Sequence, residues 1–142
     1  MANWTHFISD DCELGKKITL EHSWPNGIPF KKIDLLFIDT SHEYKHTLRE
    51  LEIWLPLMNK GAWILFHDTN LTSKPTRRLS GSLNYGWDNS RGVTRAIEKF
   101  FGIAMYDREL YSSKIAGVGD FIFHLPWNNG LTAIRVHADR NF

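Results

Sequence analysis

Four side chains that can bind a cation or move a proton follow two short apolar runs of this 142-residue chain. Asp39 and His42 follow the first run, and His67 and Asp68 follow the second. Two carboxylates in one place repel each other unless a proton, a cation or a hydrogen-bond donor lies between them. An imidazole with an ordinary pKa of about 6.5 accepts protons near neutral pH. The four residue types together indicate acid–base or metal chemistry.

The two apolar runs, Ile33–Ile38 and Ala62–Phe66, are predicted to be buried strands. The segment between them carries apolar residues at helical spacing, so a helix is expected there. A strand, a helix and a strand of this length form a right-handed crossover with parallel strands. Because parallel strands end at the same edge of a sheet, Asp39 and Asp68 should share that edge, where open α/β sheets bind ligands.

Each of these residues also has a plainer interpretation. Asp39 could cap the next helix, Asp68 could order its own loop, His42 could be an exposed first-turn residue and His67 an inward residue at a strand end. The remaining five histidines lack metal-ligand spacing and are interpreted as structural or surface residues: His6, His22, His46, His124 and His137. Cys12 has no partner motif and is interpreted as inert.

Other segments complete an α/β pattern over one domain, residues 1–142. A short strand is predicted at Trp4–Ile8, followed by Asp10 and Asp11, which could cap a helix or accept a hydrogen bond from an adenine amino group. Residues 69–89 show no periodicity and are predicted to be a long loop or lid. Asn129-Gly130 predicts a terminal antiparallel hairpin. We expect parallel strands, this hairpin at one edge, and helices on both faces.

The composition excludes several classes of partner. The 17 basic and 16 acidic residues nearly cancel, which argues against a nucleic-acid or membrane-surface role. No apolar stretch is long enough for a membrane span, and the N-terminus lacks the features of a signal peptide. A single cysteine excludes an internal disulfide framework. A cytoplasmic location is therefore expected.

The stretches 33–44, 51–61 and 62–69 together resemble class I S-adenosylmethionine-dependent methyltransferases, and most closely the cephalosporin hydroxylase-like and catechol-type O-methyltransferases. The resemblance implies a partial Rossmann-like sheet and a small hydroxylated methyl acceptor. It implies that Asp10, Asp11 and Asp39 bind S-adenosylmethionine, and that His42 and Asp39 act in catalysis. It also implies that a divalent metal such as Mg²⁺ binds Asp39, Asp68 and His67.

The chain also departs from this family's pattern. The Gly-rich turn after the family's first strand and the acidic residue that closes its second strand are both absent, so the chain resembles the carboxyl-terminal part of such a domain. His67 stands where several metal-dependent relatives have a carboxylate, and Thr69 where catechol-type relatives have Asn. The Trp4–Ile8 strand is expected to pack differently than in the family, or two chains to associate.

Three hypotheses remain open on the sequence. The first is an O-methyltransferase, or its carboxyl-terminal fragment. The second is a catalytically incompetent truncated domain that acts through self-association, because the strand at Ile33–Ile38 would be an exposed apolar edge and would favour a homo-oligomer. The third is a metal-dependent hydrolase that uses Asp39, His42, His67 and Asp68.

Overall fold

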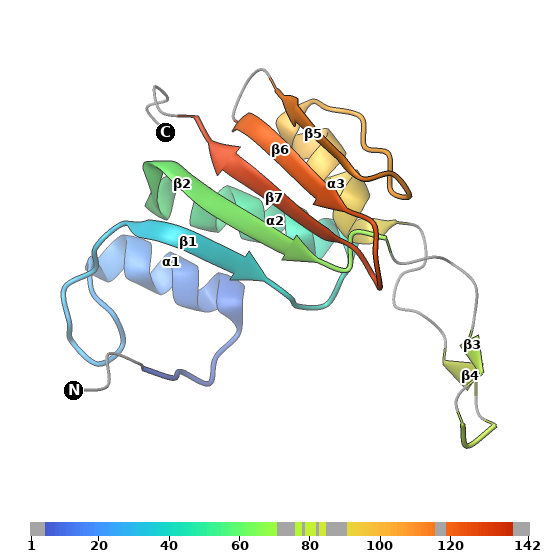
Figure 1. Ribbon diagram of the computed structural model, residues 1–142. Helices are drawn as coiled ribbons and strands as arrows, with labels where there is room; N and C mark the ends of the chain where they lie inside the picture. Colours follow the sequence, from blue (N-terminus) through green and yellow to red (C-terminus); the bar gives the residue numbers. More distant parts are fainter. Residues whose placement is uncertain are drawn as a thin grey trace.

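The computed structural model describes residues 5–70, 76–77, 79–81, 83–84, 91–115 and 119–137. The elements follow one another along the chain as shown in Figure 1: α1 (Asp11–Glu21), β1 (Ile33–Ile38), α2 (Tyr44–Trp54), the 3₁₀ turn η1 (Leu55–Leu57), β2 (Met58–His67), β3 (Thr76–Arg77), β4 (Leu83–Asn84), α3 (Gly92–Phe101), β5 (Tyr111–Lys114), β6 (Gly119–Leu125) and β7 (Leu131–Val136).

Five strands form one mixed sheet in the order β1-β2-β7-β6-β5. β1 and β2 are parallel, with Ile38 opposite Phe66, and every other neighbouring pair in this sheet is antiparallel. The β6–β7 hairpin turns at Asn128, Asn129 and Gly130, two of which have positive φ angles. The α/β class, the parallel pair and the terminal antiparallel hairpin are therefore confirmed. β5 extends the sheet beyond the expected hairpin.

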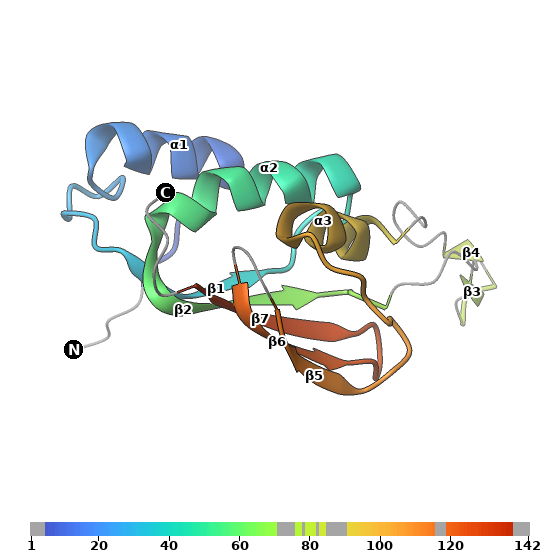
Figure 2. The same ribbon diagram turned by 90° about the horizontal axis from the view of Figure 1, so that it is seen from above.

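The helices α1, α2 and α3 of the described residues lie on one face of the sheet (Figure 2), which differs from the expected helices on both faces. The core lies between this face and the helices, where Ile64, Phe66 and Ile134 are fully buried. On the other face, Leu35 and Phe37 are 59% and 53% exposed. Successive right-handed crossovers that proceed in one direction across a sheet place their helices on the same side. Helices cover both faces when crossovers add strands on both sides of the first strand. In the described sheet they add strands on one side of β1 only.

The predicted strand at Trp4–Ile8 is not present in its described part. Residues 5–8 have no strand assignment, because a strand needs a hydrogen-bonded neighbour and none lies beside this segment in the sheet. The Phe7 ring instead stacks on Trp24 with a centroid distance of 5.8 Å. The segment thus packs as a loop against the chain that follows α1.

The predicted loop at residues 69–89 falls largely outside the described residues. Within it the structure describes a short antiparallel hairpin of β3 and β4. The first two residues of the predicted loop, Thr69 and Asn70, bind the β6–β7 turn, since the Asn70 backbone N–H donates to the Asn129 carbonyl at 2.6 Å. Among the described helices, none is long and apolar enough to cross a membrane.

Candidate active site at the carboxyl edge of the parallel strands

Asp39 and Asp68 meet on either side of His42, at the edge where β1 and β2 end. The His42 Nε2 atom lies 2.7 Å from Asp68 Oδ2 and 3.3 Å from Asp39 Oδ1. The predicted convergence of the two carboxylates is therefore confirmed, and it follows from the parallel register, which places Asp39 beside His67. An imidazole between two carboxylates supplies the hydrogen-bond donor that keeps them together.

His67 completes this cluster from the end of β2. Its Nδ1 atom lies 3.0 Å from Asp68 Oδ2 and 3.6 Å from Asp39 Oδ1. Asp68 is only 7% exposed, whereas the side chain of Asp39 is 47% exposed. Asp68 is thus the inner carboxylate, where a charge–dipole or ion-pair interaction is least screened by water, and Asp39 is the one that solvent or a ligand can reach.

The backbone holds two of these residues in an uncommon conformation. His42 and Asp68 both have left-handed φ angles, 60° and 58°, a region that His, Asn and Asp adopt more often than other residues with a Cβ. Sparsely populated backbone conformations of this kind recur at functional sites, where the surrounding structure holds them. Gly92, at the start of α3, packs directly on this loop: a Cβ there would lie 2.2 Å from the His42 carbonyl oxygen and 2.9 Å from the Tyr44 nitrogen.

A chain of buried polar groups supports the loop after Asp68. The Thr69 and Thr132 hydroxyls are 2.9 Å apart, and His124 Nδ1 lies 2.8 Å from the Thr132 hydroxyl. The Thr94 hydroxyl donates to the Thr69 carbonyl at 2.8 Å. These four residues come from four different elements or loops, so the backbone that carries Asp68 is held from β7, β6 and α3.

Asp10 and Asp11 differ in their surroundings. Asp10 is exposed and caps α1, with its Oδ1 atom accepting from the Glu13 backbone N–H at 2.9 Å. Asp11 turns toward α2 instead, where its Oδ1 atom lies 3.3 Å from His46 Nε2. The capping interpretation of Asp10 is confirmed by this hydrogen bond. The two carboxylates therefore do not form a single ligand-facing pair.

Thr40 and Glu50 belong to the surroundings of the site and were not singled out from the sequence. The Thr40 hydroxyl, next to Asp39, donates to Glu50 Oε1 at 2.8 Å. Burial, followed by the proximity of Asp11, raises the pKa of Glu50 to about 9. The sequence did contain one indication of this environment: His46 and Glu50 are four residues apart and therefore share one face of the predicted helix.

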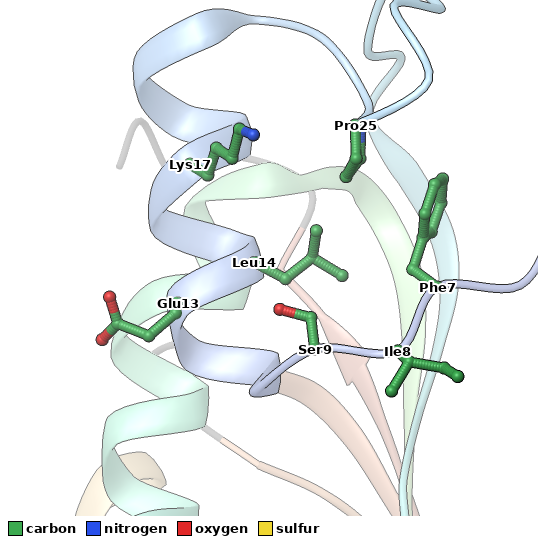
Figure 3. Close-up of a pocket in the computed structure, with 7 residues that line it drawn as sticks. All are labelled: Phe7, Ile8, Ser9, Glu13, Leu14, Lys17 and Pro25. Atoms are coloured by element: carbon green, nitrogen blue, oxygen red, sulfur yellow. The ribbon is translucent and has the colours of Figure 1, made fainter.

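A shallow pocket of about 430 Å³ lies between α1 and the segment that precedes it. Figure 3 shows Leu14 and Pro25 pointing into this space from opposite sides, with Ser9 and Lys17 near it. None of the predicted site residues lines it. The pocket has both apolar and charged lining residues, whereas the acid–base groups lie at the sheet edge.

The residues at the sheet edge also suit a divalent cation. Asp39, His67 and Asp68 each offer one ligand atom, and these atoms lie within 4.8 Å of one another. Asp68 Oδ1 is buried and has no hydrogen-bond partner among the described residues, so it retains the capacity to bind a cation. Two carboxylates with an imidazole favour a transition metal such as Mn²⁺ or Fe²⁺ over Mg²⁺, which prefers oxygen ligands alone.

Residues 3–69 of the chain match the model of a family described as a methyltransferase domain. No curated protein and no solved structure gives a significant match. The matched segment includes Asp39, His42 and Asp68 together with α1, β1, α2 and β2. The match shows that this part of the chain is similar to a methyltransferase domain.

Proposed function

We propose that the chain is the acceptor side of an S-adenosylmethionine-dependent O-methyltransferase of the cephalosporin hydroxylase-like and catechol-type group, acting on a small hydroxylated molecule. One observation carries the proposal. His42 Nε2 lies within 3.3 Å of two carboxylates at the sheet edge, inside the segment that matches a methyltransferase domain. Because Nε2 donates its hydrogen to these carboxylates, the imidazole would take the proton of a bound hydroxyl group at its other ring nitrogen, Nδ1.

The proposed roles of Asp68 and Asp39 follow from how deeply each carboxylate is buried. Asp68, buried and 2.7 Å from His42 Nε2, orients the imidazole and stabilises it once it is protonated. Asp39, the exposed carboxylate, positions the acceptor hydroxyl. S-adenosylmethionine, when bound, supplies an electrophilic methyl group to the hydroxyl oxygen. A divalent cation on Asp39, His67 and Asp68 would lower the pKa of that hydroxyl.

The chain has a candidate residue for binding the adenine portion of the cofactor. Asp10, exposed at the start of α1 next to Ser9 of the pocket, is the residue we assign to the adenine amino group. We do not assign this role to Asp11, because its carboxylate lies against His46. The sequence has no Gly-rich turn of the kind that holds the methionine and ribose portions. We therefore expect weak binding of the cofactor by this chain.

The test is methyl transfer from radiolabelled S-adenosylmethionine to a panel of catechol, a simple phenol and a hexose. We expect transfer to at least one acceptor, and a loss of about 10²- to 10⁴-fold in His42→Gln, because a general base contributes that much. His6→Gln, in the exposed segment before α1, is the matched control and should keep full activity. Absence of transfer to every acceptor, or a fully active His42→Gln, would overturn the proposal.

A second candidate function is a non-catalytic module that associates with a copy of itself. It is favoured by the open edge of β1, which pairs only with β2 in the described sheet, and by the exposure of Leu35 and Phe37. An unpaired apolar edge strand is a template for pairing with another chain. Sedimentation velocity distinguishes the two: a dimer without methyl transfer supports this candidate, and an active monomer excludes it.

A further inference from the structure

A second cluster of side chains that can bind a metal lies between α1 and α2, away from the cluster of Asp39, His67 and Asp68. Asp11 and Cys12 stand in the first turn of α1, and His46 and Glu50 lie one turn apart on α2. Figures 1 and 2 show these helices side by side on the same face of the sheet. Two helices thus each present two such side chains to a common space.

The ligand atoms are close enough to share one ion. One atom each from Asp11, Cys12 and His46 lies within 4.8 Å of the other two. His46 Nε2 is 3.3 Å from Asp11 Oδ1 and 3.7 Å from Glu50 Oε1. A tetrahedral zinc ion, with bonds of about 2.0–2.3 Å, sets its ligand atoms roughly 3.3–3.8 Å apart. The spacing around His46 therefore already matches what the ion requires.

Glu50 gives an independent reason to expect a cation. This residue is 1% exposed, and its Oε2 atom is buried with no hydrogen-bond partner in the part of the chain that the structure describes. Its other oxygen accepts from Thr40 at 2.8 Å. A buried carboxylate oxygen without a donor is costly, and the neighbouring Asp11 carboxylate adds a like charge. A proton shared with Asp11 relieves this repulsion near neutral pH, as the raised pKa of Glu50 indicates, and a cation would relieve it while also binding the Cys12 sulfur and the His46 imidazole.

The chemistry of the donors selects the metal. A thiol sulfur, an imidazole nitrogen and two carboxylate oxygens form a soft and borderline set, which suits zinc and excludes Mg²⁺ or Ca²⁺ as the preferred ion. Cys12 is fully buried and His46 is 24% exposed on its side chain. Four protein ligands in a closed setting are typical of a structural zinc site, whereas a catalytic site keeps one open position.

We propose that Asp11, Cys12, His46 and Glu50 bind a structural zinc ion that fastens α1 to α2. The ion would also fix the start of the loop after β1, because Glu50 holds Thr40 beside Asp39. This proposal does not rest on methyl transfer. The site would exist in either candidate function, since neither its ligands nor its position depends on a substrate.

Cobalt substitution in the full chain tests the proposal without any activity measurement. Cys12 is the single cysteine of the chain, so a thiolate-to-cobalt charge-transfer band can arise from one site only. We expect one equivalent of Co²⁺ to produce this band with the strong visible absorption of a tetrahedral ion, and excess Zn²⁺ to remove both. A saturated Co²⁺ titration with no thiolate band, or with the weak absorption of an octahedral ion, would overturn the proposal.

Variants separate this site from the one at the sheet edge. Cys12→Ser should abolish the charge-transfer band, and Glu50→Gln should keep the band but weaken Co²⁺ binding at least about tenfold. Asp39→Asn and His67→Gln alter only the sheet-edge cluster, so as matched controls they should leave the charge-transfer band, and the Co²⁺ affinity read from that band, unchanged. If Cys12→Ser does not fold, Glu50→Gln decides: an unchanged Co²⁺ affinity in that variant contradicts the four-ligand site.

Discussion

Gly92→Ala is expected to damage the candidate active site without changing any of its polar side chains. The added methyl group would lie 2.2 Å from the His42 carbonyl oxygen and 2.9 Å from the Tyr44 nitrogen. The closest comfortable carbon–oxygen contact is about 3.3 Å, so α3 and the His42 loop must separate by about 1 Å. Both neighbours are backbone atoms, and neither can turn away as a side chain would.

This overlap sets the size of the expected effect. Forcing an extra methyl group into a close-packed site costs about 1–3 kcal/mol, which for a chain of this size lowers the melting temperature by roughly 3–15 °C. A displacement of about 1 Å at the catalytic loop also lowers methyl transfer by about 10²-fold. Thermal or urea unfolding followed by circular dichroism measures the first quantity, and the radiolabel assay measures the second.

Gly27→Ala is the matched control for this variant. Unlike Gly92, Gly27 has a positive φ angle, 79°, and a Cβ there would meet nothing within 4 Å. It should therefore cost only the backbone strain, about 1 kcal/mol, and leave methyl transfer intact. The reasoning is refuted if Gly92→Ala is as stable and as active as Gly27→Ala, because α3 would then not be packed against the His42 loop.

Three further perturbations address separate parts of the molecule. The pKa of Glu50 is about 9 in the folded chain and about 4.5 in the unfolded chain. The free energy of unfolding should therefore be highest below about pH 4.5 and should fall as the pH rises to about 9. Glu50→Gln should remove this fall, which urea unfolding in the presence of a chelator at pH 5 and 8.5 measures. Thr132→Val should lower the free energy of unfolding by about 1–3 kcal/mol, because it leaves the Thr69 hydroxyl and the His124 imidazole without their buried partner. A decrease below about 0.5 kcal/mol would show that this chain of polar groups does not stabilise the loop after Asp68. Phe37→Lys, on the 53% exposed face of the edge strand, should convert any dimer to monomer in sedimentation velocity; a dimer that persists would mean that association uses another surface.

The sheet edge was predictable from the sequence because it depends on local pattern and one topological rule. Two continuous apolar runs predicted β1 and β2, and the handedness of the crossover made them parallel. The meeting of Asp39 and Asp68 follows from that alone. The left-handed conformation of His42 and its contact with Gly92 did not follow, because they depend on where α3 packs.

Features that depend on tertiary contacts were not predictable in the same way. His46 was interpreted as a surface or structural residue and Cys12 as inert, since neither has a metal-ligand spacing along the chain. Their proximity to each other arises only when α1 lies against α2. The Trp4–Ile8 strand was wrong for a related reason: an apolar pattern can predict a strand, but only a neighbouring strand can supply its hydrogen bonds.

The most direct test of the central claim is a titration of the ¹⁵N-labelled chain with S-adenosylhomocysteine, followed by nuclear magnetic resonance. We predict saturable shifts of the backbone amides of Asp10, Asp39 and His42, with the amides of β5 and β6 unchanged. Shifts confined to other residues, or no shift at millimolar concentration, would contradict a cofactor site at the carboxyl edge of β1 and β2.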